Sequence, residues 1–190
     1  MSSSYRMELD KWLKAQNVTA ETVYDVGGSQ EKVKDRVNTW YVKDYVIFDL
    51  PNPHKDSPQP DVEIDLNKHN PQVNGYLKMA DIVFCLEVFD YVYDPVRAMK
   101  TLASLMKPTG KLYVSFPSQY PLHQPIEDDA LRYMPGGILK IAAEAGLKSA
   151  KMTPRRFETN LFEQMYRAER MRAAKHEDHN FSGWICEFTK

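Results

Sequence analysis

The feature that most constrains the fold is a short β-prone run that leads directly into paired glycines. The run Thr22–Asp25 ends in an acid, and Gly27 and Gly28 follow within three residues. The polar stretch 31–39 is predicted to be helical. Glycine tolerates positive φ and carries no side chain, and a helix N-terminus offers free N–H groups, so such a turn lets backbone approach a ligand closely. The stretch therefore predicts a ligand-binding turn after a strand.

A second acid supports this interpretation. Asp49 closes the β-prone run 44–49 and lies 21 residues after Gly28. A gap of about 20 residues is typical of an acid that binds ribose hydroxyls in a nucleotide-binding βαβ unit. A nicotinamide dinucleotide is the less favoured ligand, because Ser29 and Lys32 occupy two of the three glycine positions of that motif.

Composition limits the class of protein. The chain has 190 residues, 43% of them hydrophobic, which predicts one domain over 1–190 with a helical N-terminal extension at 1–20. The 25 basic and 26 acidic residues nearly cancel, so neither nucleic acid nor a membrane is expected as a partner. The two cysteines and five histidines show no ligand-like spacing, so no metal site is predicted. We expect a cytoplasmic protein.

Strand-like and helix-like segments alternate along the rest of the chain. The apolar run 80–86 suits a strand covered on both faces. Helices are predicted over 95–106, ended by a turn at 108–110, and over 138–145, capped by Gly146. The remaining predictions are a helix within 4–16, strands at 61–66, 111–116, 149–159 and 181–189, and a charged helix near 161–175. This order predicts a doubly wound α/β sheet with its ligand beyond the carboxyl ends of the strands.

Five segments in this order resemble the motifs of one family. They are Asp25-Val26-Gly27-Gly28-Ser29, the acid Asp49, the pair Asp65-Leu66, the segment from Cys85 to Pro95, and the segment from Leu105 to Leu112. Together they resemble the class I S-adenosylmethionine-dependent methyltransferases, over about residues 22–190.

The resemblance implies a Rossmann-like, seven-stranded sheet. Such a sheet is mostly parallel with an antiparallel last strand and has helices on both faces. The implied cofactor is S-adenosylmethionine, and no metal is implied. The residues that match the family's cofactor-binding motifs are Asp25, Gly27, Gly28, Ser29, Asp49, Leu50, Asp65, Leu66, Cys85, Leu86 and Glu87.

The acceptor side is predicted from the loop after the strand 111–116. Where many relatives have Glu-His after the fourth strand, this chain has Asp90-Tyr91. His123 is the candidate catalytic base, because it lies in the loop where the resemblance places the acceptor side; the alternative is a solvated loop histidine. Arg132 and Tyr133 are expected either to contact a polar acceptor or to hold the loop through an ion pair to Asp128 or Asp129. The substrate-contacting candidates are Tyr91, Tyr120, Arg132 and Tyr133.

The predicted function is transfer of a methyl group from S-adenosylmethionine to a small polar acceptor, at oxygen. The alternative is a non-catalytic protein that keeps the methyltransferase fold and binds S-adenosylmethionine or a nucleoside, or serves as a scaffold. The expected partner is a small-molecule acceptor, and a homodimer is left open.

Overall fold

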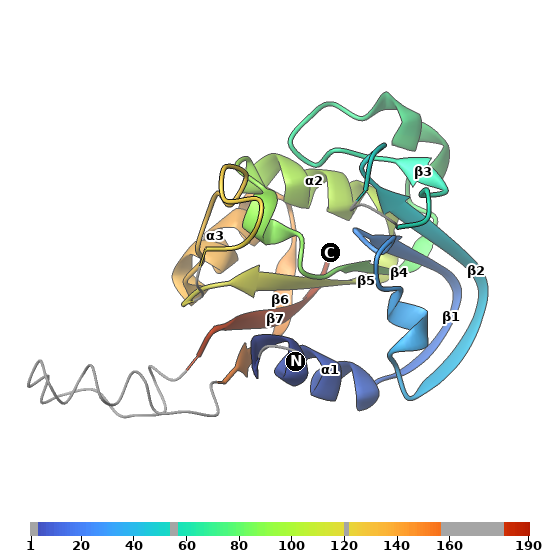
Figure 1. Ribbon diagram of the computed structural model, residues 1–190. Helices are drawn as coiled ribbons and strands as arrows, with labels where there is room; N and C mark the ends of the chain where they lie inside the picture. The colour runs from blue at the N-terminus through green and yellow to red at the C-terminus, as the bar shows by residue number, and fades with distance from the viewer. Residues whose placement is uncertain (1–3, 54–56, 120–121, 157–180) are drawn as a thin grey trace, which may run out of the picture.

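A single seven-stranded sheet organises the chain, in the order β3-β2-β1-β4-β5-β7-β6 (Figure 1). The computed structural model describes residues 4–53, 57–119, 122–156 and 181–190. β7 runs antiparallel to both of its neighbours, β5 and β6, and the other neighbouring strands pair in parallel. The strands are β1 Asn17–Val26, β2 Thr39–Asp49, β3 Val62–Glu63, β4 Ala80–Cys85, β5 Met106–Pro117, β6 Lys148–Arg155 and β7 Gly183–Thr189. The predicted sheet, with its antiparallel last strand, is confirmed.

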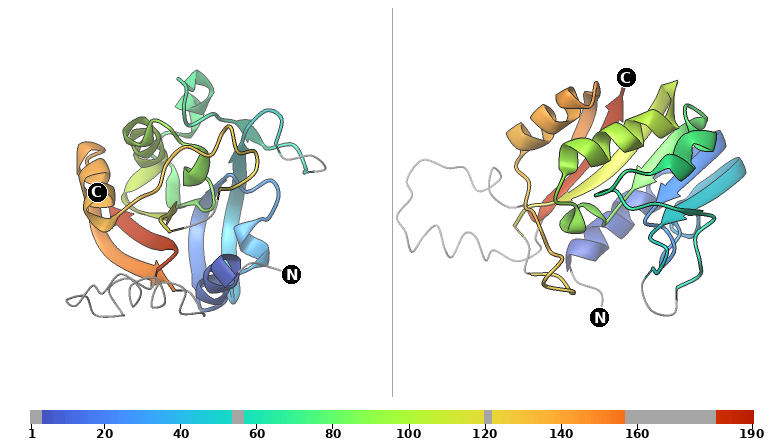
Figure 2. Two further views of the ribbon diagram at one scale, coloured as in Figure 1. Left: turned by 60° about the vertical axis from the view of Figure 1, so that its left-hand side comes forward. Right: turned by 90° about the horizontal axis from the view of Figure 1, so that it is seen from above.

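Helices cover both faces of the sheet, as predicted. The helices α2, Pro95–Leu105, and α3, Pro135–Glu144, pack on one face, and α1, Ser4–Lys14, packs on the other (Figures 1 and 2). Three short 3-10 helices, η1 Val33–Asp35, η2 Pro71–Tyr76 and η3 Phe89–Tyr91, complete the described elements. No helix in the described ranges is long and apolar enough to cross a membrane.

Alternation along β4 divides the core into two layers. Val83 and Cys85 belong to the larger cluster with α2 and α3, whereas Phe84 and Leu86 belong to the smaller cluster with α1. Side chains of a strand point alternately to its two faces, so a strand covered on both sides must be apolar throughout. The continuous apolar run at 80–86 therefore corresponds to a central strand.

The signals at the helix ends act as predicted in α2 and α3. The carboxylate of Asp94 accepts a hydrogen bond from the Arg97 N–H (3.1 Å), and Pro95 occupies the first helical turn. At the end of α3, Gly146 has φ of +72°, a left-handed conformation that favours glycine.

The helix predicted over 31–39 is wrong. Only the 3-10 turn Val33–Asp35 forms there, and β2 already begins at Thr39. The β-branched and aromatic residues from position 39 onward favour a strand, which leaves a connection too short for several helical turns. The turn therefore lacks a long helix behind it, and its N–H groups find carboxylate partners instead.

Other boundaries also differ from the prediction. β5 starts at Met106, so 108–110 lies within a strand whose register with β4 is irregular, and not in a turn after α2. A Cβ on Gly110 would lie 2.9 Å from the carbonyl oxygen of Ala80, which explains the glycine in this strand. β1 begins at Asn17, inside the predicted extension 1–20, and β3 has only two residues. The charged helix predicted near 161–175 lies outside the described residues.

Candidate functional site

The two acids predicted from the sequence lie at the carboxyl ends of neighbouring parallel strands. β1 and β2 pair as far as Val26 opposite Phe48, and the Gly27 N–H donates to the Phe48 carbonyl (2.7 Å). The Asp49 carboxylate then accepts the N–H groups of Ser29 (3.0 Å) and Leu50 (2.8 Å). Asp49 thus ties the end of β2 to the glycine turn after β1.

The glycine turn is built around a buried carboxylate. Asp25 is 2% exposed, and it accepts the Val33 N–H (2.9 Å) and the Tyr45 hydroxyl. Burial raises its pKa to about 6, with the hydrogen bonds from Tyr45 and Val33 acting in the opposite direction. A Cβ on Gly28 would lie 2.4 Å from Asp25 Cγ, so only glycine allows the backbone to cross this carboxylate. The buried carboxylate of Asp25 therefore determines the conformation of the glycine turn.

The same turn has polar capacity for a ligand. Ser29 is 2% exposed, and its Oγ has no hydrogen-bond partner among the described residues. A buried hydroxyl without a partner is unusual and calls for an explanation such as a bound ligand or water. The Asp49 carboxylate accepts two N–H groups and, with four lone-pair sites, can accept further bonds from hydroxyls. These donors and acceptors fit the polar groups of an adenosyl cofactor.

The other predicted cofactor residues lie at or after the ends of β2, β3 and β4, in different environments. Leu50 is exposed, Leu66 and Leu86 are buried, and Asp65 accepts the Asn67 N–H (3.0 Å) and pairs with Lys68 (2.9 Å). Cys85 lies at the end of β4, opposite Val26 of β1, and is fully buried. Burial, followed by the charges of Asp25 and Asp49, raises the pKa of the Cys85 thiol well above its usual range, so the thiol is uncharged.

A buried ion pair at the end of β4 was not predicted from the sequence. Glu87 has φ of +59°, and both of its carboxylate oxygens contact the guanidinium of Arg155 from β6. Ser115 of β5 joins them: its Oγ accepts the Glu87 N–H (2.7 Å) and donates to Glu87 Oε1 (2.9 Å). The Arg155 side chain is fully buried, whereas that of Glu87 is 30% exposed.

Asp90 is a second buried acid on this side of the site. It is 4% exposed, and its Oδ1 lacks a hydrogen-bond partner in the part of the chain that the structure describes. Burial and, next, the charge of Glu87 raise the pKa of Asp90 to about 7, while Arg132 and Arg155 act in the opposite direction. A burial-raised pKa near neutrality is common at functional sites, although structural networks also produce it.

The raised pKa of Asp90 predicts a pH-dependent loss of stability. The folded protein binds a proton at Asp90 more tightly than the unfolded chain does, so stability falls as the pH rises from about 4 to about 7. Asp90→Asn should remove this pH-dependent loss of stability. The variant should be more stable than wild type by roughly 2 to 4 kcal/mol at pH 8, with little difference near pH 4. Urea unfolding at several pH values measures the difference. A difference that does not change with pH would contradict the assignment.

The loop after β5 folds back onto η3 through the predicted substrate residues. The Tyr91 hydroxyl contacts His123 Nδ1 and donates to the Gln124 carbonyl (2.7 Å). Asp129 accepts the His123 N–H (2.8 Å) and pairs with Arg132 through two contacts of 2.5 and 2.6 Å. The predicted ion pair from Arg132 to Asp129 is thus present, and it holds the loop. His123 itself is exposed.

Two further tyrosines, Tyr133 and Tyr120, were predicted to contact the substrate. Tyr133 is 4% exposed, packs against Phe89 and Phe116, and donates its hydroxyl to the Val92 carbonyl (3.2 Å). Its environment is that of a core residue, and contact with a substrate stays a prediction. Tyr120 lies outside the described residues.

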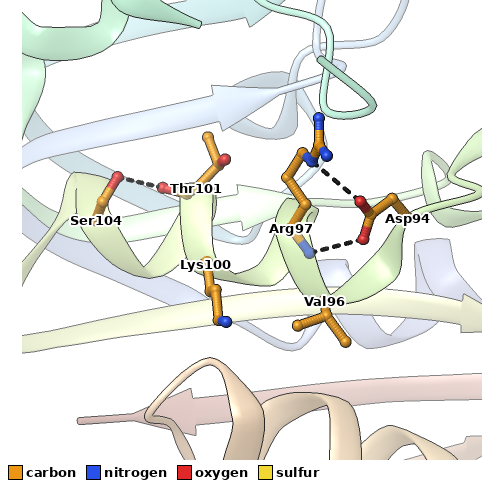
Figure 3. A pocket seen from close by; sticks show the side chains of 6 residues that line it. All are labelled: Asp94, Val96, Arg97, Lys100, Thr101 and Ser104. Carbon is orange, nitrogen blue, oxygen red and sulfur yellow. Dashed lines mark hydrogen bonds and ion pairs between the residues drawn. The ribbon is translucent and has the colours of Figure 1, made fainter. Parts of the chain in front are cut away.

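A hollow of about 520 Å³ lies elsewhere, on the outer face of α2 (Figure 3). Six residues line it: Asp94, Val96, Arg97, Lys100, Thr101 and Ser104. Asp94 and Arg97 already pair with each other there (3.0 Å), and Ser104 donates to the Thr101 carbonyl (2.6 Å). The acids Asp25, Asp49, Glu87 and Asp90 do not line this hollow, so we do not identify it with the functional site.

Comparison with known proteins agrees with this geometry. A family model described as "Methyltransferase domain" matches residues 4–181. None of the curated protein sequences matches the chain significantly.

Three solved structures illustrate the similarity of fold. A chain from the complex between the Haloferax volcanii Trm112 methyltransferase activator and a methyltransferase has a TM-score of 0.63 and 17% identity, covering 98% of this chain and 92% of that one. Mitomycin 7-O-methyltransferase has a TM-score of 0.60 and 14% identity over 97% of this chain, which spans 53% of that protein. Burkholderia thailandensis 1,6-didemethyltoxoflavin-N1-methyltransferase, with bound 1,6-didemethyltoxoflavin and S-adenosylhomocysteine, has a TM-score of 0.59 and 8% identity, covering 99% and 78%.

The family model spans nearly the whole described chain, and the glycine turn with its two acids occupies the strand ends where this fold binds its cofactor. The chain belongs to the class I S-adenosylmethionine-dependent methyltransferases.

Proposed function

We propose that the protein transfers a methyl group from S-adenosylmethionine to a small polar acceptor, at an oxygen atom, beyond the carboxyl ends of β1, β2 and β4. The observation that carries the proposal is the turn in which Asp49 accepts the Ser29 N–H while the buried Ser29 hydroxyl has no partner among the described residues. Ligands of open α/β sheets bind at this edge, where the strand order reverses.

The cofactor would be held by residues from four strand ends. In our proposal Asp49 accepts the ribose hydroxyls, and Gly27, Gly28 and Ser29 bring backbone and a hydroxyl to the methionine end. Asp65 and Leu66 lie on the adenine side, and Cys85, Leu86 and Glu87 form the wall after β4. When bound, the sulfonium of S-adenosylmethionine supplies an electrophilic methyl group, so the protein's main task is to orient the acceptor.

The acceptor side of the proposal rests on the loop after β5. An alcohol must lose its proton on methylation, and the base in our proposal is His123, which is exposed and contacts the Tyr91 hydroxyl. Arg132 and Tyr91 hold the loop around this histidine. Mitomycin 7-O-methyltransferase and the toxoflavin N1-methyltransferase show by their names that this fold serves both oxygen and nitrogen acceptors.

The setting of the reaction follows from composition. A net charge of −1 supports a small molecule as the partner and gives no support for nucleic acid. Cys85 and Cys186 are buried free thiols, which suits a reducing compartment, so we place the protein in the cytoplasm. A homodimer remains open.

Turnover of labelled S-adenosylmethionine with a panel of small alcohols, phenols and amines tests the proposal. His123→Ala should lower kcat by about a hundred-fold and leave S-adenosylhomocysteine affinity unchanged, because general base catalysis contributes on that order. His69→Ala, at another exposed loop histidine, serves as the control and should match wild type. Cofactor binding without turnover of any acceptor would instead support a non-catalytic adenosyl-binding or scaffold protein.

A further inference from the structure

The ion pair between Glu87 and Arg155 joins the end of β4 to the end of β6, the edge strand of the sheet, and it contains a buried arginine. Arg155 has a fully buried side chain, and a buried guanidinium is tolerated only when it is paired and hydrogen-bonded. Its partner Glu87 is 68 positions away in sequence and lies beyond β4, whereas Arg155 ends β6. Two strands, β5 and β7, separate β4 from β6 in the sheet.

The sheet register explains how the arginine reaches across this distance. Arg155 pairs with Gly183 of β7, and Gly183 pairs with Pro117 of β5. The strand next to Arg155 therefore presents no side chain at this register. Ser115, two residues before Pro117, supplies the hydroxyl that meets Glu87. Three strands thus cooperate to hold one carboxylate.

Glu87 is held so that part of its side chain stays accessible. Its side chain is 30% exposed, although both carboxylate oxygens contact Arg155. A carboxylate has about four lone-pair sites, so it can still accept a hydrogen bond from a ligand. Its φ of +59° is unfavourable for a residue with a side chain, and such conformations concentrate at ligand sites.

Asp90 gives an independent indication that a hydrogen-bond donor belongs beside this pair. It is 96% buried, and Oδ1 finds no partner within the described ranges. Glu87 and Arg155 are the charges that act on it from β4 and β6, and Asp129 and Arg132 act from the loop after β5. A buried acceptor without a donor is what an incoming hydroxyl would satisfy.

The charges of this cluster select against an anion. Among the described residues Glu87 pairs with Arg155 and Asp129 pairs with Arg132, so above its pKa of about 7 the Asp90 carboxylate adds a negative charge to this cluster. A carboxylate or phosphate on an acceptor bound beside Glu87 would be repelled by the ionised Asp90, and the repulsion is stronger because Asp90 is buried. An uncharged hydroxyl meets no such penalty.

We propose that Glu87 accepts a hydrogen bond from the methyl acceptor, that it selects uncharged, hydroxyl-bearing acceptors over carboxylate- or phosphate-bearing ones, and that Arg155 is the residue that positions Glu87. This inference rests on the proposed methyltransferase function and assigns Glu87 to the acceptor, whereas the family resemblance assigns it to the cofactor.

The test compares acceptors that share a ring and differ in charge. Phenol, catechol and glucose are matched with benzoate, salicylate and glucuronate, and each is titrated against protein saturated with S-adenosylhomocysteine, with the unfolding midpoint as readout. KM and kcat are measured with S-adenosylmethionine for those that turn over. The variants are Glu87→Gln and Arg155→Lys. Glu187→Gln is the control, because Glu187 pairs with Lys111 (2.8 Å) far from the strand ends at the site.

In wild type, uncharged members should raise the midpoint and their anionic counterparts should not. Glu87→Gln should weaken the response or raise KM by about ten- to a hundred-fold, as expected for one hydrogen bond to a charged group, with unchanged affinity for S-adenosylhomocysteine. Arg155→Lys keeps the positive charge but loses the two parallel contacts of the guanidinium with Glu87. It should therefore raise KM, by less than Glu87→Gln does. Glu187→Gln should match wild type.

Three results would overturn the inference: preference for the anionic members, no response to any member, or loss of S-adenosylhomocysteine affinity in Glu87→Gln. The last result would return Glu87 to the cofactor site. Failure of the wild type to bind S-adenosylhomocysteine is a separate outcome, and it would contradict the proposed function as well.

Discussion

Gly28→Ala should destabilise the protein by about 3 kcal/mol and abolish binding of S-adenosylhomocysteine. The new Cβ would lie 2.4 Å from Cγ and Oδ2 of Asp25 and 2.8 Å from its Oδ1. Asp25 cannot move aside without breaking its bonds to Val33 and Tyr45 and leaving a buried carboxylate without them. Overpacking a core costs about 1–3 kcal/mol, and the lost hydrogen bonds add to this. For a chain of this length the unfolding midpoint should fall by roughly 6–12 °C.

Gly137→Ala is the matched control for this substitution. Gly137 lies in α3, where a Cβ would meet nothing within 4 Å, so alanine should be neutral or stabilise by up to about 1 kcal/mol. Thermal unfolding followed by circular dichroism measures both variants. A midpoint for Gly28→Ala within 2 °C of wild type corresponds to a loss of stability of roughly 1 kcal/mol or less. Such a result would show that the turn is less tightly packed than described.

Asp49→Asn should weaken binding of S-adenosylhomocysteine by about a hundred-fold or more. The carboxylate is the acceptor that our proposal places against the ribose hydroxyls, and hydrogen bonds to a charged group contribute roughly 1.5–3 kcal/mol each. An amide also replaces one acceptor oxygen by a donor, which disturbs the bond from either Ser29 or Leu50. Both effects act on the cofactor, so the loss should exceed that of any substitution on the acceptor side.

Asp44→Asn provides the control because Asp44 lies on the same strand, is exposed, and is five residues before the strand end. Calorimetric titration of both variants with S-adenosylhomocysteine gives the affinities. Equal affinities for Asp49→Asn and wild type would remove Asp49 from the cofactor site.

Local sequence signals were sufficient for the elements of the sheet and for the turn. The apolar run 80–86 predicted a strand covered on both faces, and Gly146 predicted the end of α3, because each depends on neighbouring residues alone. The helix predicted over 31–39 failed because β2 extends back to Thr39, and strand pairing with β1 overrides the local preference.

The acceptor side was less predictable because its contacts join distant parts of the chain. Arg155 stands in a polar segment with nothing to mark it, and its contact with Glu87 depends on the order of four strands. Asp90 stands where many relatives have a glutamate, but its burial beside Glu87 and the arginines cannot be predicted from one sequence. The glycine turn depends on one short segment and two strand ends, so local signals predicted that Asp25 and Asp49 lie beside it.

Binding of S-adenosylhomocysteine by the wild-type protein tests the central claim most directly, with reduced nicotinamide dinucleotide as the control ligand. At a hundred times its dissociation constant, a ligand that binds only the folded state stabilises it by about 2.7 kcal/mol, which is readily measured by thermal unfolding. We predict a rise in the midpoint with S-adenosylhomocysteine alone. No rise with S-adenosylhomocysteine, or an equal rise with the dinucleotide, would contradict a methyl-donor site at the turn between β1 and β2.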